Sequence, residues 1–230
     1  AMRFDLALPS ELHLENFVKV VQKGNVLLAF KNSMIVTAAV VLVVTLCTSL
    51  SSFVIARRND RFSSFLSGYY SLGLIVPWAI VPTVLLLKIL HIQNTQLGLI
   101  AVLIALNIPW GSFIITNFIN TIPRELDEAA AIDGCGPLTL FFRVVLPLLK
   151  PVVATNTIIF GMGAFNELQA PLYLLSSSAL TTLPLTVYNF KGRYFSEWNL
   201  IFADLLLVAL PMVILYVICQ KYIVSGVTAG

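Results

Sequence analysis

The sequence predicts an all-α membrane protein, a polytopic bundle of hydrophobic helices. Of its 230 residues, 58% are hydrophobic and only 11% are charged, and the mean hydropathy is +0.92. A soluble domain has about 45–50% apolar and about 25% charged residues. The 14 Lys and Arg and the 11 Asp and Glu are too few to solvate a soluble fold of this size, and a net charge of +3 indicates no polyanion partner. The composition therefore argues against a soluble enzyme, a disordered protein and a nucleic-acid-binding protein.

Five apolar segments are long enough to cross the roughly 30 Å of hydrocarbon as helices. Helices are expected because every backbone donor and acceptor inside lipid must be paired within its segment. A barrel is disfavoured because runs such as 37–46 do not alternate polar and apolar residues. In chain order, the predicted spans are 34–56, 66–87, 97–119, 151–175 and 198–222.

Local signals indicate where the spans begin, end and bend. Asn32 and Ser33 are expected to cap the first span, and Arg57 is expected to end it. A proline inside a helix removes one backbone hydrogen bond. Because Pro77 and Pro82 both fall in the second span, that span is the one expected to bend.

Residues 1–33 are expected to form an extracytoplasmic leader segment, followed by a single transmembrane domain over 34–230. With loops 57–65 and 120–150 and the C-terminus on one side, the two sides carry equal numbers of Lys and Arg. The cluster of Arg57, Arg58 and Arg61 favours that side as the cytoplasm. Five spans would leave the N-terminus outside without a visible translocation signal, so a sixth span is expected before Ala1.

Loop 120–150 is the longest polar connection between the predicted spans, and it has helix start and stop signals. Pro123 suits a first helical position, acidic residues suit the positive end of the helix dipole, and Gly134 suits the end of the helix. A second short helix is expected from Pro137 towards Pro147. The first helix presents a small apolar face of Leu126, Ala129 and Ala130.

Such a face suits close contact with another protein, so we expect the helix to lie in a groove of a cytoplasmic partner. The alternative is a helix that rests on lipid headgroups. Helices of that kind are usually rich in Lys and Arg, whereas this one is acidic.

The residues of this loop also follow a known spacing: Glu128-Ala129-Ala130, three residues, Gly134, nine residues, and then Val144-Val145-Leu146-Pro147. The spacing resembles the EAA loop of ABC-importer permeases, EAA-x3-G-x9-I-x-L-P, with Val144 in place of Ile. The run Phe165-Asn166-Glu167 resembles the Trp-Asn-Glu that is common in the carbohydrate-uptake branch.

This resemblance implies the type I ABC importer permease fold, in a bacterial or archaeal plasma membrane. It also implies a second permease subunit (identical or different), two cytoplasmic ATPase subunits that hold ATP and Mg²⁺, and an extracytoplasmic solute-binding protein. The substrate would be a sugar or oligosaccharide. The residues that the resemblance assigns to coupling with the ATPase are Glu128, Ala129, Ala130, Asp133, Gly134, Leu146 and Pro147.

Two acids, Glu167 and Asp204, lie within apolar spans. A central intramembrane acid costs about 2.5–3.5 kcal/mol on insertion scales, so each is expected to face the protein interior or a cavity. The neighbouring Asn166 and Glu167 can hydrogen-bond sugar hydroxyls, although Glu167 could equally be structural. The predicted substrate pathway is Phe165, Asn166, Glu167 and Asp204, with Phe165 less suited than Trp to stack on a sugar.

Several motifs are absent from the sequence. It contains no GxxxxGK[ST] phosphate loop, so we expect no ATPase activity and no cofactor on this chain. His13 and His91 are isolated, and no metal site is predicted. The alternative to an ABC permease is an ion-coupled secondary transporter or channel that uses Glu167 and Asp204, a class that often has inverted repeats.

Overall fold

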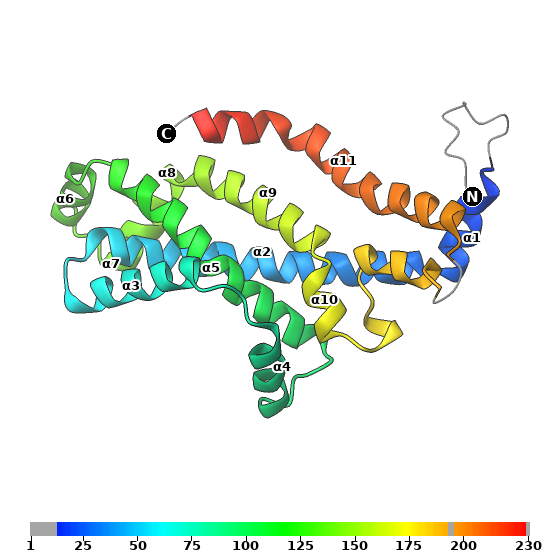
Figure 1. The fold of residues 1–230 in the computed structure, drawn as a ribbon. Helices are drawn as coiled ribbons and strands as arrows, with labels where there is room; N and C mark the ends of the chain where they lie inside the picture. The colour runs from blue at the N-terminus through cyan, green and yellow to red at the C-terminus, as the bar shows by residue number, and fades with distance from the viewer. Residues whose placement is uncertain (1–12, 193–195, 229–230) are drawn as a thin grey trace.

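The computed structural model describes residues 13–192 and 196–228, with side chains up to Ile218. Over these ranges the chain is an all-α bundle of long helices that lie side by side (Figure 1). The elements in order are α1 Glu15–Lys23, α2 Val26–Arg57, α3 Arg61–Ile75, α4 Ile80–Ile89, α5 Gln96–Thr121, α6 Glu125–Ile132, α7 Pro137–Leu140, the π-helical turn η1 Phe141–Val145, α8 Leu146–Leu148, α9 Lys150–Asn166, α10 Gln169–Leu174, the 3₁₀ helices η2 Ser178–Leu180 and η3 Leu183–Phe190, and α11 Trp198–Thr228.

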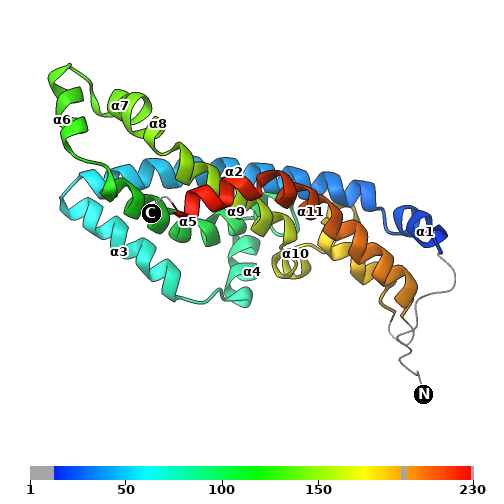
Figure 2. The same ribbon diagram turned by 90° about the horizontal axis from the view of Figure 1, so that it is seen from above.

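Helix α2 is the central element of the bundle. It packs against α5 and α9, while α11 covers α9 and also contacts α1 and η3 (Figures 1 and 2). Three apolar clusters lie along the bundle: one around Val20 and Phe165, one around Val40 and Phe160, and one around Ile115. The bundle therefore has two ends, one formed by α1 and η3 and the other by α6, α7 and α8 (Figure 1).

Three of the predicted spans are single long apolar helices in the structure, namely α2, α5 and α11. The other two are not continuous. The predicted span 66–87 divides into α3 and α4, because residues 76–79 around Pro77 leave the helical conformation. The predicted span 151–175 divides into α9 and α10 at Glu167, and α9 meets the preceding segment Pro137–Leu148 at 76°. By length and composition, the described residues hold three membrane-spanning helices, or four if that bent pair is one span.

The helix that contains the first predicted span begins before residue 34. Helix α2 begins at Val26, after Asn25 in the left-handed conformation (φ 51°), and not at residue 34. The predicted boundary between a 1–33 leader and the membrane domain therefore falls inside one helix. The described part of the leader also packs on the domain, because α1 contacts both α2 and α11. Residues 1–12 lie outside the described part of the chain.

Asn32 and Ser33 do not cap a helix but lie buried inside α2. The Asn32 amide donates to the carbonyls of Ala179 and Thr181 at 2.9 and 3.0 Å, and its oxygen accepts from Gln96 at 2.9 Å. The Ser33 hydroxyl accepts from a backbone N–H of η3 at 2.8 Å. These polar groups hold the long connection between α10 and α11 against α2 and α5.

Candidate functional site

The predicted coupling loop lies at the end of the bundle where α2 and α5 terminate (Figure 1). Its first helix, α6, begins at Glu125, and the Arg124 carbonyl accepts from Asp127 N and Glu128 N at 2.9 and 3.1 Å. Pro123 precedes the helix and does not occupy its first position. The acids of the first turn therefore lie at the positive end of the helix dipole, as predicted.

Gly134 ends α6 in the manner predicted, and the backbone shows why. Its φ is +81°, a conformation that costs other residues energy because of their Cβ atom. Cys135 N donates to Ala130 O at 2.9 Å and Gly134 N donates to Ala131 O at 3.0 Å. This pair of hydrogen bonds is a Schellman motif, which satisfies carbonyls that a helix end leaves free.

The exposed face of α6 differs in one residue from the predicted face. Ala130 is buried, on a helix that contacts the chain's own α7 and η1, whereas Glu128, Ala129, Asp133 and Gly134 are exposed. Ile132, which sequence reasoning missed, is 87% exposed. A large apolar side chain presented outward beside small and acidic residues suits a protein-binding surface.

An ion pair connects α6 to the end of α2. Arg57 Nε and Asp127 Oδ2 lie 2.6 Å apart, and the two side chains are only 10% and 17% exposed. Arg57 Nη2 also donates to the Ile122 carbonyl at 3.2 Å, and Arg124 Nη2 donates to the Ala56 carbonyl at 3.3 Å. The sequence predicted that Arg57 ends a span and that Asp127 stabilises the helix dipole. It gave no sign that the two residues form an ion pair.

The short turn between α2 and α3 lies at the same end of the bundle. Asp60 caps α3 by accepting from the Ser63 backbone N–H at 2.9 Å, and the Ser63 hydroxyl oxygen accepts from the Asp60 backbone N–H at 3.3 Å. This backbone hydrogen bond, with the neighbouring Arg58, lowers the pKa of the Asp60 carboxyl. The turn is therefore fixed by a capping box.

The second half of the loop is packed on α5. Phe141, Val145 and Leu149 are buried in a cluster with Ile115 and Ile119 of α5, and Leu146 packs at its edge. Pro147 is exposed in the first turn of α8. The short helix predicted from Pro137 is present, but no sequence signal indicated the π-helical turn that η1 inserts.

The four predicted pathway residues have different environments. Phe165 is 1% exposed and packs edge-on against Phe30, with ring centroids 6.2 Å apart, so it is a core residue and not a surface for a sugar. Asn166 is exposed at the end of α9. Phe165, Asn166 and Glu167 are adjacent in the sequence, but their side chains have different surroundings in the structure.

The two intramembrane acids both have partners in the chain. The Glu167 carboxylate accepts from Gln169 N and Ala170 N at 2.8 and 3.0 Å, which starts α10 directly after the break. Asp204 is fully buried in α11, and the Thr186 hydroxyl of η3 donates to its Oδ2 at 2.9 Å. In this conformation both carboxylates connect helices.

A family model decides the identity of the chain. The model for the inner membrane component of binding-protein-dependent transport systems matches residues 49–229. The chain belongs to this family. The permease is therefore the membrane-embedded transport subunit of an ABC importer, a multi-pass protein of the plasma membrane.

Relatives and solved structures agree with this assignment. The permease is 34% identical to the multiple sugar-binding transport system permease protein MsmG of Streptococcus mutans, over 100% of this chain and 84% of the relative. It is 32% identical to the melibiose/raffinose/stachyose import permease protein MelC of Bacillus subtilis, over 96% and 82%. Its fold matches a chain of a bacterial ABC transporter that imports the acidic polysaccharide alginate, with a TM-score of 0.82, 18% identity, and 96% and 83% coverage.

Proposed function

We propose that this permease forms, with a second permease subunit, the membrane pathway through which an ABC importer takes up a sugar or oligosaccharide. Separate cytoplasmic ATPase subunits would supply ATP and Mg²⁺, and an extracytoplasmic binding protein would deliver the sugar. The sugar class is supported by MsmG and MelC, whose names specify sugars, and by the alginate importer of similar fold. A bacterial plasma membrane is supported by the sources of these relatives.

The observation that carries the coupling part of the proposal is the presentation of α6. The helix is short, acidic and exposed, and its end is fixed by the Gly134 motif. The predicted coupling residues Glu128, Ala129, Asp133 and Gly134 are on its outer surface. A groove on the ATPase can therefore receive the helix without rearrangement of the permease.

The links of α6 to α5 and α2 provide a route by which the ATPase would move the spans. Helix α6 follows α5 after a three-residue link and is joined to the end of α2 by Arg57 and Asp127. Leu146 and Pro147 lie at the bend that leads into α9. Closure of the ATPase subunits would move these helices as rigid bodies and alternate the access of the pathway.

The test is the separation of ATP hydrolysis from uptake in the assembled importer. Gly134→Asp would strain the φ of +81°, and Glu128→Arg would reverse a charge on the docking face. Both variants should insert normally and hydrolyse ATP, with uptake per ATP reduced about tenfold or more for a lost contact of at least about 1.4 kcal/mol.

Gly136→Asp is a matched control, because it adds the same charge two residues away at an ordinary φ, with open space around the position. It should retain near-normal coupling. Full substrate-stimulated ATPase and uptake in both Gly134→Asp and Glu128→Arg would contradict the coupling assignment.

The ion-coupled alternative gains no support from the structure, because Glu167 and Asp204 already accept hydrogen bonds from their own chain. It makes a different prediction that is simple to check. A secondary transporter would take up sugar in liposomes under an ion gradient without ATPase subunits, whereas we expect the isolated permease to show no such uptake.

A further inference from the structure

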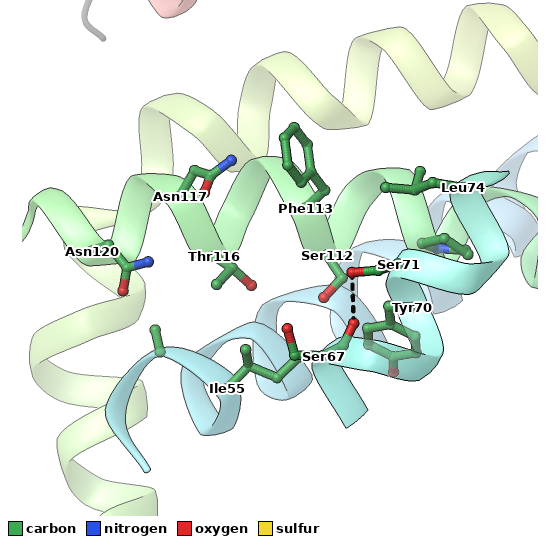
Figure 3. Close-up of a pocket in the computed structure, with 12 residues that line it drawn as sticks. Ile55, Ser67, Tyr70, Ser71, Leu74, Ser112, Phe113, Thr116, Asn117 and Asn120 are labelled. Carbon is green, nitrogen blue, oxygen red and sulfur yellow. Dashed lines mark hydrogen bonds between the residues drawn. The ribbon is translucent and has the colours of Figure 1, made fainter. Parts of the chain in front are cut away.

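A cavity of about 360 Å³ lies between α2, α3 and α5, in the half of the bundle that leads to α6 (Figure 3). Its volume is within the range of about 300–1,000 Å³ that is common for small-molecule sites. It is separate from the predicted pathway residues, none of which lines it. The residues that line it are Ile55, Ala56, Ser67, Tyr70, Ser71, Leu74, Pro109, Ser112, Phe113, Thr116, Asn117 and Asn120.

Two polar stripes face each other across this cavity. On α5, Ser112, Thr116 and Asn120 follow one another at intervals of four residues, so they share one face of the helix. On α3, Ser67 and Ser71 have the same spacing (Figure 3). These polar side chains therefore lie on the sides of α3 and α5 that line the cavity.

The polar groups of the α5 stripe are only partly used by the protein. The Ser112 hydroxyl is within 3.3 Å of the Ser52 hydroxyl of α2. Thr116, Asn117 and Asn120 have no hydrogen-bond partner for their side chains among the residues that the structure describes. Asn117 and Asn120 are exposed and Thr116 is partly exposed, so their polar groups can pair with water or with a ligand.

The chemistry of the lining specifies the kind of ligand. Hydroxyl and amide groups can each donate and accept, which matches the hydroxyls of a sugar. The rings of Tyr70 and Phe113 offer apolar faces on which the C–H face of a sugar ring can pack. No lining residue carries a charge at neutral pH, so the cavity contains nothing that would compensate a buried carboxylate.

We propose that this cavity is a binding station for a neutral sugar on its way to the cytoplasm, and that it disfavours acidic sugars. The inference rests on the proposed sugar-import function and adds a site and a charge class to it. Ala56 connects the site to coupling, since it lines the cavity and its carbonyl accepts from Arg124 beside α6. Movement of α6 therefore changes the wall of the cavity.

The test is protection of a single cysteine in the fully assembled importer, without ATP. In a chain whose native cysteines are replaced, Ser67→Cys places a thiol in the cavity, and Ser64→Cys on the same helix is the control, because Ser64 does not line it. A water-soluble maleimide should label the Ser67→Cys variant. Melibiose or raffinose at ten times its Kd should lower that rate about tenfold, and alginate oligosaccharide should not.

A Ser67→Cys variant that does not react, or whose labelling rate neither neutral sugar changes, would overturn the proposal, as would equal protection of the Ser64→Cys control. Protection by alginate oligosaccharide but by neither neutral sugar would contradict the proposed preference for neutral over acidic sugars. Labelling needs no ATP hydrolysis, so it tests the binding site alone. ATP-driven uptake of sugar by the unmodified importer tests the proposed function separately.

A second measurement uses matched substitutions on α5. Thr116→Val removes a hydroxyl from the cavity at nearly constant volume, whereas Thr121→Val removes one that donates to Phe118 O outside it. Loss of one neutral hydrogen bond predicts a KM for sugar uptake about 2- to 12-fold higher in Thr116→Val only. Equal KM values in the two variants would contradict a sugar contact at Thr116.

Discussion

Arg57 and Asp127 form the ion pair that joins the exposed helix α6 to the first long helix α2. The residue pair is mostly buried, with its charged atoms 2.6 Å apart. Removing one partner of such a pair leaves an uncompensated charge, so the loss exceeds the value of the pair itself. The local signals at both residues had other sufficient explanations, which is why the sequence did not indicate the contact.

We expect Asp127→Asn, which keeps the shape of the side chain, to lower both thermal stability and uptake per ATP. The double variant Arg57→Asp with Asp127→Arg should be more stable than the sum of its single variants Arg57→Asp and Asp127→Arg predicts, with a coupling energy of about 0.5–3 kcal/mol in that double-mutant cycle. Thermal unfolding of the purified importer and the ratio of uptake to hydrolysis measure the two effects. Strictly additive losses would show that the ion pair does not hold α6 to α2.

At the scale of elements, α2 and α9 both lie close to α5 at Gly111. A Cβ atom at this position would lie 2.8 Å from Thr48 Cγ2 of α2 and 2.9 Å from the Phe160 ring of α9. The close approach of helices at small residues is typical of membrane bundles. A side chain at position 111 would therefore push against both α2 and α9.

Gly111→Ala should destabilise the bundle by about 1–3 kcal/mol through overpacking. Gly163→Ala in α9 is the matched control, since it gains the same helix propensity with no atom within 4 Å of the new Cβ. Unfolding temperatures in detergent compare the two variants. A Gly111→Ala protein as stable as the Gly163→Ala protein would mean that the helices move apart at no cost.

Elements also show what the sequence could and could not predict. Hydrophobic length located α2, α5 and α11, and the start and stop signals located α6, because these properties belong to the segment itself. Pro77 and Pro82 predicted the bend of the second span, and the structure has its break at 76–79. The break at Glu167 and the early start of α2 depend on contacts with other parts of the chain. Hydropathy measures how favourably a residue transfers into lipid. The polar Asn32 can be buried in α2 because its amide is hydrogen-bonded to the connection between α10 and α11.

At the scale of the whole molecule, charge alone does not orient the bundle, because the two predicted sides carry equal numbers of Lys and Arg. Helices α6, α7 and α8 form one end and α1 and η3 form the other (Figure 1). The coupling assignment makes the first end cytoplasmic. The same assignment places the tethered connection between α10 and α11 outside, where a binding protein would arrive.

Single cysteines can test this orientation in a background without native cysteines. Gly136→Cys and Glu15→Cys are both at exposed positions, at opposite ends of the molecule. A membrane-impermeant maleimide should label the Gly136→Cys variant only in inside-out vesicles and the Glu15→Cys variant only in right-side-out ones. The reverse pattern would mean that α6 faces away from the cytoplasm and that the coupling assignment is wrong.

The break between α3 and α4 has a consequence for biogenesis. Helix α3 has 15 residues, which rise about 22 Å and fall short of the roughly 30 Å of hydrocarbon. The insertion machinery meets two short apolar pieces here, neither of which is a stable span alone. Helix α3 packs on α2 and α5, and α5 is synthesised after it. We therefore expect the segment to reach its final position only after α5 has been synthesised.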